Sequence, residues 1–171
     1  MSLVTVDIGC GSRKVEGAIG IDGIYQPGVN IVCDFEKSIP LKTNSVDILH
    51  TSHLLEHIQN LVQLMEEAYR VCKPGGQVYI TVPYFTSRGA FRDPTHVRYL
   101  SEETFMYFQT PAPYKIRTDF KIQNIHYKYR TLFRYFPEFI RKIFRRHLWN
   151  VVDEITVSLK VGDTSFNNSK Q

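Results

Sequence analysis

An apolar run that ends in an acidic residue and a Gly-x-Gly turn opens the chain: Val4-Thr5-Val6-Asp7-Ile8-Gly9-Cys10-Gly11. A strand that runs into a glycine turn lets backbone N–H groups approach a ligand closely, because glycine has no Cβ and tolerates positive φ. The dinucleotide-binding fingerprint has a third glycine three positions after the second, and Lys14 occupies that position here. The turn therefore favours a nucleoside-containing cofactor over a dinucleotide pyrophosphate, with an ordinary tight turn as the alternative.

The first half of the chain alternates between strand-like and helix-like segments. One stretch, His57–Val71, has its apolar residues at helical spacing and is predicted to pack on a sheet. Alternation of this kind favours a parallel α/β sheet. The predicted strands are Val4–Ile8, Ala18–Ile21, Asn30–Val32, Val46–Thr51 and Gln77–Val82, the last of them placed just after the turn Pro74-Gly75-Gly76.

The pattern changes after Pro83, and the second half contains longer alternating segments. The predicted elements are a short helix that begins at Ser101, a strand over Phe120–Tyr129, a helical segment over Thr131–Val152 and a final antiparallel strand over Glu154–Val161. We expect one domain over residues 1–162, with residues 131–152 as a basic helical insertion, and a disordered tail over 163–171. The predicted fold is a Rossmann-like, doubly wound, seven-stranded mixed sheet, mostly parallel, with the last strand antiparallel.

Composition fits a globular protein and narrows its setting. The chain has 171 residues, 43% of them hydrophobic, and no apolar run long enough for a transmembrane helix. Three cysteines without Cys-x-x-Cys spacing argue against structural disulfides and zinc knuckles. The cysteine pattern favours a reduced cytoplasmic setting, and the N-terminus lacks the basic and apolar regions of a signal peptide.

Acidic residues follow the second and third predicted strands, as Asp22 and Asp34. Ligands of open parallel sheets bind beyond the carboxyl ends of the strands. Asp22, when ionised, can accept hydrogen bonds from both hydroxyls of a ribose, and Asp34 can accept from an adenine amino group, with Phe35 or Ile24 against the base. The alternative is that each carboxylate only starts a loop.

An ordered series of motifs resembles the class I S-adenosylmethionine-dependent methyltransferases, in particular the group called methyltransferase type 11. The resemblance covers roughly residues 3–83 and is thin beyond residue 108. The matching segments are Val6-Asp7-Ile8-Gly9-Cys10-Gly11, Gly20-Ile21-Asp22, Asp34-Phe35, Ser45-Val46-Asp47-Ile48, Ser52-His53-Leu54-Leu55-Glu56-His57-Ile58 and Glu67-Ala68-Tyr69-Arg70-Val71-Cys72-Lys73-Pro74-Gly75-Gly76.

This resemblance implies S-adenosylmethionine as the cofactor, S-adenosylhomocysteine as the product, and a set of binding residues. The implied cofactor-binding residues are Asp7, Gly9, Cys10, Gly11, Asp22, Gly23, Ile24, Asp34, Phe35, Thr51, Ser52 and His53. Within that set, Gly9 and Gly11 would lie under the methionine part and Asp7 would anchor their loop. Only ten residues separate Gly11 from Asp22, too few for a helix and two turns, so we expect the first crossover to be a short loop.

The segment His53-Leu54-Leu55-Glu56-His57 also matches the His-x-x-Glu-His pattern of inverted zinc peptidases. On a helix, His53 and His57 would share one face and could bind Zn²⁺ with Glu56 as base. A third ligand is not evident downstream, so the sequence predicts no metal site. Glu56 and His57 are instead assigned to the substrate side or to a helix cap.

The segment from Tyr84 to Tyr99 follows the fifth predicted strand, where a loop would cover an α/β site. Transfer of a methyl group to a hydroxyl needs alignment and a base. His96 is the predicted base, oriented by Asp93, while Tyr84 and Arg98 would position the acceptor. The alternative is that Asp93-Pro94 starts a turn and His96 has a structural role.

Basic residues concentrate in one segment. Residues 1–114 hold 9 Lys/Arg against 12 Asp/Glu, a balance of −3, whereas residues 115–150 hold 10 against 2, a balance of +8. Apolar residues between Phe136 and Val152 recur at helical spacing with Arg141, Lys142, Arg145 and Arg146 between them. This predicts an amphipathic helix with a basic face, which either packs as an ordinary domain helix or contacts an anionic membrane surface. Nucleic acid is a less favoured partner, because no RNA-binding motif is evident.

These features predict methyl transfer from S-adenosylmethionine to a small-molecule, lipid-linked or glycan acceptor, at oxygen. The alternatives are a cofactor-binding module without catalysis and a zinc peptidase that uses His53-x-x-Glu56-His57. The sequence leaves the acceptor and the oligomeric state open.

Overall fold

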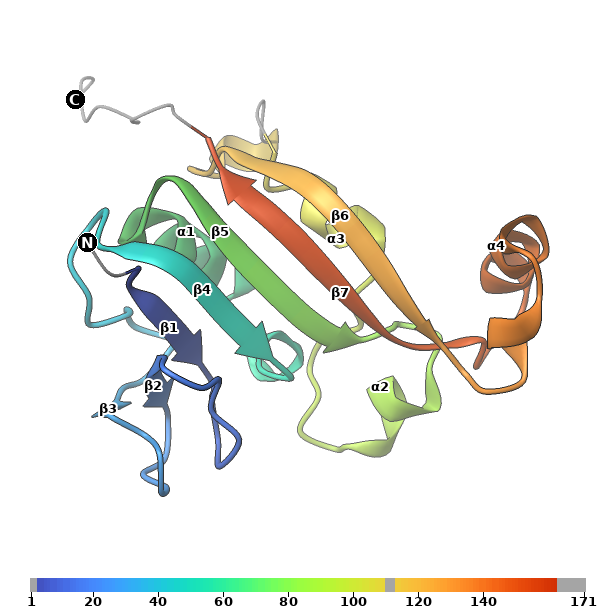
Figure 1. Ribbon diagram of the computed structural model, residues 1–171, viewed down its shortest axis with the longest axis horizontal. Coiled ribbons are helices and arrows are strands. Elements are labelled where there is room, and N and C mark those ends of the chain that lie inside the picture. Colours follow the sequence, from blue (N-terminus) through green and yellow to red (C-terminus); the bar gives the residue numbers. More distant parts are fainter. Residues whose placement is uncertain (1–2, 110–112, 163–171) are drawn as a thin grey trace.

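A twisted seven-stranded sheet runs through the molecule in the order β3-β2-β1-β4-β5-β7-β6 (Figure 1). The structure is a computed structural model that describes residues 3–109 and 113–162, so the predicted tail over 163–171 lies outside the described residues. The strands are β1 (Thr5–Ile8), β2 (Ile19–Asp22), β3 (Ile31–Val32), β4 (Val46–Ser52), β5 (Cys72–Pro83), β6 (Phe120–Tyr129) and β7 (Val152–Val161).

Strands β1 to β5 pair in parallel, whereas β7 pairs antiparallel with both β5 and β6. The predicted mixed sheet with an antiparallel last strand is therefore confirmed. β1 lies between β2 and β4, so the direction in which the strands are added reverses beside the glycine turn. Ligands of open α/β sheets bind at such a point.

One face of the sheet forms the core. In β7 the residues Val152, Ile155, Val157, Leu159 and Val161 are buried, and they pack in one cluster with apolar residues of β1, β4, β5 and α1 (Leu61–Val71). The intervening β7 residues are half-buried, as expected for strands whose side chains alternate between two faces. Figure 1 shows α1 and α3 (Glu102–Met106) behind the sheet.

The connections between the first four strands contain no described helix. The expected short first crossover is thus confirmed: residues 9–18 connect β1 and β2 as a loop. The predicted helix over His57–Val71 begins later, at Leu61. Asn60 caps it by accepting a hydrogen bond from the Gln63 N–H at 3.2 Å, and the residues before it form the 3-10 turn η1 (Leu55–His57). Two further short helices are α2 (Arg88–Arg92) and η2 (Pro113–Lys115).

Strand β5 begins before the Pro74-Gly75-Gly76 segment and not after it. Cys72 pairs with Val46, and the next pair joins Gln77 to Ile48, so the intervening residues bulge out of the ladder. Gly75 has a φ of +78° in this bulge, a conformation suited to glycine. Regular pairing starts at Gln77, where the sequence placed the strand.

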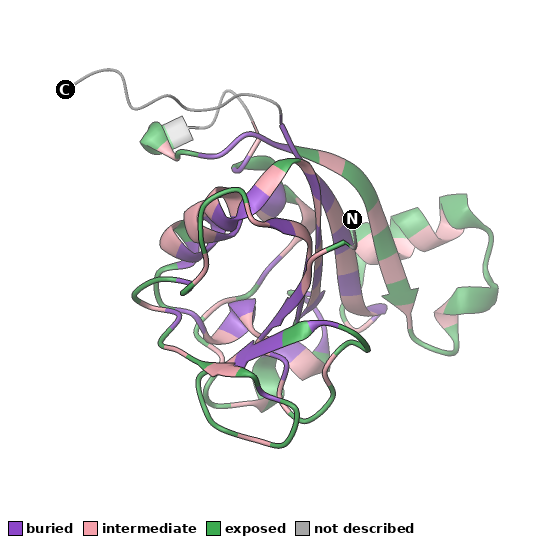
Figure 2. Cartoon of the chain, turned by 60° about the vertical axis from the view of Figure 1, so that its left-hand side comes forward, coloured by how far each residue is buried: buried purple, intermediate pink, exposed green. Residues whose placement is uncertain are grey.

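The basic segment forms an arm beyond the ends of β6 and β7 (Figure 1, Figure 2). The continuous helix predicted over Thr131–Val152 is wrong. The segment contains η3 (Phe133–Tyr135) and the ten-residue α4 (Glu138–His147), because Pro137 at the N-cap interrupts the helix and Asn150 has a φ of +61°. None of the α4 residues is buried.

Two arginines hold α4 against β6. The Arg145 guanidinium lies 3.8 Å from the centroid of the Tyr127 ring, and its Nη1 donates to the Tyr129 hydroxyl at 2.6 Å. The Arg141 guanidinium lies 4.8 Å from the Tyr129 ring centroid. The predicted amphipathic helix therefore packs through part of its basic face, while Phe139 and Ile143 remain 68% and 54% exposed. Among the described residues, no helix is both long and apolar enough to cross a bilayer.

Candidate functional site

The glycine turn after β1 is held in place by Asp22, at the end of β2. The Gly11 N–H donates to Asp22 Oδ2 at 2.8 Å, and the Ile24 N–H donates to Oδ1 at 3.1 Å. Each carboxylate oxygen keeps a further lone-pair direction for a ligand hydroxyl. Asp22 therefore orders the turn and can still accept hydrogen bonds from a ribose.

Gly9 has a steric reason to be glycine. Its φ is +67°, and a Cβ there would lie 2.8 Å from Leu54 Cβ. Gly11 has a φ of +51°, but a Cβ there would meet open space. The turn thus packs closely against the segment after β4 at Gly9 and faces outward at Gly11.

Asp7 is buried beneath this turn, where its Oδ2 accepts a hydrogen bond from the Val15 N–H at 2.9 Å. Burial raises the pKa of the Asp7 carboxyl, and the Val15 hydrogen bond opposes that shift. The neighbouring thiol of Cys10 is also buried, which raises its pKa. The Val15 hydrogen bond ties Asp7 to the loop, the anchoring role that the resemblance implied for this residue.

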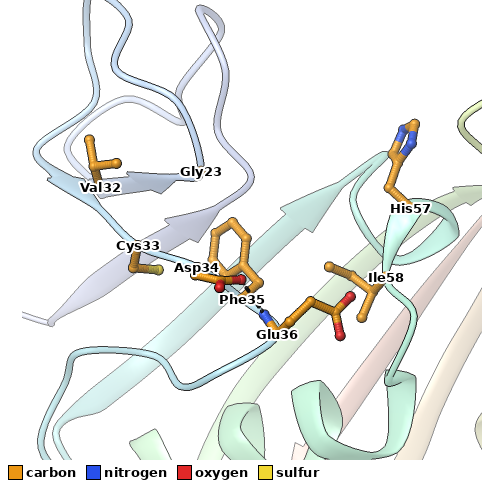
Figure 3. A pocket seen from close by; sticks show the side chains of 8 residues that line it. All are labelled: Gly23, Val32, Cys33, Asp34, Phe35, Glu36, His57 and Ile58. Carbon is orange, nitrogen blue, oxygen red and sulfur yellow. Dashed lines mark hydrogen bonds between the residues drawn. The ribbon is translucent and has the colours of Figure 1, made fainter.

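A cavity of about 600 Å³ lies beyond the ends of β2 and β3 (Figure 3). Asp34 lies on its wall, with Oδ1 accepting from the Glu36 N–H at 3.0 Å. Phe35 lines the cavity, whereas Ile24 is not among the lining residues and is 71% exposed. The lining residues are Gly23, Val32, Cys33, Asp34, Phe35, Glu36, His57 and Ile58.

Four residues that line this cavity were not predicted as site residues from the sequence: Val32, Cys33, Glu36 and Ile58. Glu36 accepts hydrogen bonds from the Gln59 and Asn60 N–H groups at 2.6 and 3.1 Å, which ties the third strand's loop to the segment before α1. No local pattern marks this contact, because more than twenty residues separate the partners along the chain.

The end of β4 turns sharply at His53, a non-glycine residue with a φ of +55°. Its Nδ1 lies 3.2 Å from Glu56 Oε1, and its Nε2 lies 3.6 Å from Glu154 Oε1. The hydrogen bond with Glu56 raises the pKa of His53, against the opposing effect of burial. Thr51, just before the turn, is buried and Ser52 is exposed.

A second cavity, of about 760 Å³, adjoins the first and shares His57 with it. It contains four of the residues predicted for the catalytic and substrate side, Glu56, His57, Asp93 and His96, together with His53 from the predicted cofactor-binding set. The other lining residues, Asp153 and Glu154 of β7 among them, were not predicted. They are Arg13, Pro83, Arg88, Gly89, Arg92, Lys128, Arg130, Asp153 and Glu154.

Two predicted acceptor contacts are corrected by the structure. Tyr84 is 3% exposed and packs in the core against Phe85 and Tyr127, outside the lining of the cavity. Arg98 donates to the backbone carbonyl oxygens of Ile58, at 2.8 Å from Nε, and of Gln59. Tyr84 therefore has a packing role, and Arg98 joins the loop after α2 to the segment before α1.

Asp93 does not orient His96 through the expected bond. His96 Nδ1 lies 2.9 Å from the Ala90 carbonyl oxygen, and Asp93 Oδ2 lies 3.9 Å from Nε2. The Asp93 carboxylate instead accepts from Thr95, through its N–H at 2.9 Å and its hydroxyl at 2.7 Å. These hydrogen bonds lower the pKa of Asp93, with smaller effects from His96 and His57.

The zinc-peptidase interpretation is wrong in its geometry. His53 lies before the 3-10 turn with a left-handed backbone, so His53 and His57 do not share one face of a regular helix. His96 instead approaches His57, with ring centroids 4.7 Å apart. The two residues come from segments that are nearly forty positions apart in the sequence, so spacing gave no signal.

Comparisons with known proteins bear on the family and on the fold. A family model described as a methyltransferase domain matches residues 23–80. A 50-residue stretch is 38% identical to the biotin biosynthesis bifunctional protein BioHC of Cellvibrio japonicus, over 29% of this chain and 10% of that protein. The chain thus spans about a tenth of the length of this curated relative.

Solved structures share the fold at low identity. A SAM dependent methyltransferase from Archaeoglobus fulgidus has a TM-score of 0.64 and 18% identity, covering 92% of this chain and 86% of that one. The [4+2]-cyclase SpnF has a TM-score of 0.63 and 17% identity, covering 95% and 76%. Because one neighbour is a cyclase, the reaction must be argued from the site.

Proposed function

We propose that this chain is a class I S-adenosylmethionine-dependent methyltransferase that transfers a methyl group from S-adenosylmethionine to an oxygen of an anionic glycan or lipid-linked acceptor. The two adjoining cavities carry the proposal. The first has the carboxylate of Asp34 and the ring of Phe35 for a nucleoside, and the second has charged groups for an acceptor.

The cofactor would extend along the carboxyl ends of the strands. Its adenine would lie near Asp34, its ribose on Asp22, and its methionine part over Gly9 and Gly11. Since His57 lines both cavities, this course directs the methyl group toward the second cavity. In-line attack requires the acceptor oxygen and the sulfonium methyl group to meet at that junction.

Basic side chains in the second cavity favour an acceptor that carries negative charge. Arg13 comes from the glycine loop, Arg88 and Arg92 from α2, and Lys128 and Arg130 from the end of β6. Glu154 and Asp153 pair with the last two, at 2.9 and 3.8 Å. The three arginines remain to bind a phosphate or carboxylate, for which the guanidinium geometry is suited.

Exposed aromatic rings beside this cavity favour a glycan. Phe91 of α2 stacks on Tyr99 with ring centroids 4.4 Å apart, and Trp149 lies 5.6 Å from Phe91. All three residues are at least 49% exposed. Flat, exposed aromatic surface next to cationic groups suits a sugar ring that bears an anionic substituent.

His96 remains the proposed base. Its Nδ1 faces a carbonyl oxygen and must carry the proton, so Nε2 has a free lone pair. The acceptor O–H would give its proton to Nε2 while the oxygen forms a bond to the methyl carbon. The C–S bond breaks, and sulfur keeps the electron pair as S-adenosylhomocysteine.

The α4 arm supports an acceptor at a membrane surface. Phe139 and Ile143 are exposed on α4, where Lys142 and Arg146 are exposed as well, and Leu132 and Tyr135 are about 70% exposed nearby. Interfacial helices combine exposed apolar and basic residues in this way. We propose peripheral contact with anionic lipids, with steep loss of vesicle binding at high salt; no binding at low salt would contradict it.

Transfer assays with matched acceptors test the function. We expect turnover with phosphorylated glycans, little with their neutral counterparts, and a higher KM for the anionic acceptor in Arg88→Gln and Arg92→Gln. Binding of S-adenosylhomocysteine by calorimetry without turnover on any acceptor of this class would favour the alternative, a cofactor-binding module without catalysis. Lys121→Gln, on the exposed part of β6, is the charge-matched control.

A further inference from the structure

Glu56, His57 and His96 converge in the second cavity, and one ligand atom from each lies within 4.8 Å of the other two. We propose that these three side chains bind a divalent transition-metal ion. The inference differs from the peptidase pattern read in the sequence, since His53 is replaced by His96 and the ligands come from two distant segments.

The hydrogen bonds of His96 prepare it as a ligand. Its Nδ1 lies 2.9 Å from the Ala90 carbonyl oxygen, which can only accept, so Nδ1 carries the proton. Nε2 therefore has the free lone pair. Metal-binding histidines typically donate their other ring N–H to a backbone carbonyl or a carboxylate, which fixes the tautomer and the ring orientation.

His57 is oriented by a relay of the same kind. The Thr95 hydroxyl donates its single hydrogen to Asp93 Oδ1 at 2.7 Å, so its oxygen must accept from His57 Nδ1 at 2.9 Å. This again leaves Nε2 of His57 unprotonated. Two neighbouring imidazoles thus present lone pairs, with their Nδ1 atoms engaged by an oxygen.

Glu56 supplies the independent observation. The residue is 1% exposed, its Oε1 contacts His53 Nδ1 at 3.2 Å, and its Oε2 is buried without a hydrogen-bond partner among the described residues. A buried carboxylate oxygen without a partner is costly. A cation held by Glu56, His57 and His96 would compensate this oxygen directly.

Two nitrogen ligands and one oxygen ligand define the class of ion. Imidazole ligands suit Zn²⁺, Co²⁺, Ni²⁺ and Fe²⁺ and disfavour Mg²⁺ and Ca²⁺, which prefer all-oxygen sites. Ligands of a tetrahedral Zn²⁺ ion lie roughly 3.3 Å apart, so the three atoms, which lie within 4.8 Å of one another, would have to move closer together to bind one ion. Three protein ligands leave a position open toward the cavity, as in catalytic zinc sites.

The site deepens the proposed function and rests on it for its chemical role. An acceptor hydroxyl at the open position would be acidified by the ion and would release its proton to solvent before its oxygen attacks the methyl carbon. In the metal-bound protein His96 is then a ligand, and this role replaces the role of base that the proposed function gives it in the metal-free protein. Removal of the ion by chelators should therefore lower the rate of methyl transfer.

Metal titration of untagged protein tests the proposal without an acceptor. We expect one Zn²⁺ or Co²⁺ per chain by calorimetry, with a Co²⁺ absorption spectrum typical of nitrogen and oxygen ligands in a low-coordinate site. His57→Ala and His96→Ala should each lower the affinity at least about tenfold, and Glu56→Gln should do the same. His126→Ala, an exposed histidine on β6, should leave it unchanged.

Circular dichroism and thermal unfolding of each variant show whether it is folded, and His57→Ala and His96→Ala provide two routes if Glu56→Gln is unstable. Failure of the wild-type protein to bind any of these ions would overturn the proposal, and so would wild-type affinity in the His57→Ala and His96→Ala variants. Calorimetry with S-adenosylhomocysteine on metal-free protein is independent of this site. A protein that binds the cofactor product but no metal would refute the metal site alone, and one that binds metal but no cofactor product would refute the proposed function alone.

Discussion

The two ends of the site are built differently. On the cofactor side, Asp7, Asp22 and Asp34 each accept a hydrogen bond from a backbone N–H less than twelve residues away. On the acceptor side, Glu56, His57 and His96 meet from two segments, and Glu56 Oε2 has no hydrogen-bond partner among the described residues. The cofactor side is therefore ordered by local backbone geometry, and the acceptor side by tertiary packing that keeps chemical groups available.

The largest expected effect is a loss of stability when the local geometry at Gly9 is disrupted. Gly9→Ala places a Cβ at 2.8 Å from Leu54 Cβ in a backbone with a φ of +67°. The clash and the left-handed conformation together should lower the free energy of unfolding by about 3 kcal/mol. Gly11→Ala is the matched control, because its Cβ meets open space, and it should cost about 1 kcal/mol. Chemical denaturation measures both, and equal losses would contradict the close packing of Gly9 on Leu54.

A second substitution tests whether the cofactor side and the acceptor side of the site bind their ligands independently. Asp22→Ala removes the acceptor of the Gly11 and Ile24 N–H groups and the proposed ribose ligand. We expect calorimetry to show an affinity for S-adenosylhomocysteine that is roughly 30-fold weaker, at about 2 kcal/mol, with Zn²⁺ affinity unchanged. Asp153→Ala, in the second cavity, should leave the S-adenosylhomocysteine affinity as it is. A loss of both affinities in Asp22→Ala would mean that the two ends are not independent.

The cofactor side of the site, which is ordered by local contacts, could be predicted from the sequence. The run into Gly9 and Gly11, and the acids at Asp22 and Asp34, depend on contacts over a few residues and on strand order, so pattern was sufficient. The same holds for the strand over Phe120–Tyr129, whose alternation gave its bounds.

The acceptor side of the site could be predicted from the sequence only in part. His96 and Glu56 were singled out, but no spacing indicates that a loop near residue 96 folds onto the turn after β4. Tyr84 was misplaced because polarity does not reveal burial, and the helix over Thr131–Val152 was too long because Pro137 and Asn150 end regular structure within an apolar pattern. Interactions between distant segments, and not propensity, decide these positions.

A third change tests the contact that Glu67 of α1 makes with Arg70 and with the Ile39 backbone. Glu67 accepts hydrogen bonds from Arg70 Nε at 2.7 Å and from the Ile39 N–H at 2.9 Å, and Arg70 lowers the pKa of the Glu67 carboxyl. Since the folded-state pKa is depressed, this stabilisation is present above the unfolded-state pKa and is lost as pH falls through the folded-state pKa. Glu67→Gln should reduce the free energy of unfolding by about 1.5 kcal/mol at pH 7.

The pH series supplies the check on that prediction. The difference in unfolding free energy between Glu67→Gln and the wild-type protein should shrink as the pH falls below about 4.5, the ordinary value for a glutamate. A difference that stays constant down to pH 3 would show that Glu67 contributes through packing and not through its charge. Asn60 N-caps the same helix without titrating, so Asn60→Ala serves as the pH-independent reference.

The smallest effect concerns the α4 arm, where exposed charge and not packing is at issue. Arg146 is exposed, unlike Arg141 and Arg145, which lie over the rings of Tyr129 and Tyr127. Arg146→Gln should therefore leave thermal stability unchanged and weaken binding to phosphatidylserine-containing vesicles about fivefold, at about 1 kcal/mol for one basic residue near the surface. Lys121→Gln removes the same charge from an exposed site on β6, outside the arm, and should not change vesicle binding. Equal losses of vesicle binding in the two variants would mean that net charge alone attracts the chain to the membrane. A loss of vesicle binding confined to Arg146→Gln would assign the contact to the exposed side of α4. Phe139 and Ile143 can enter the membrane interface there, beside Arg146.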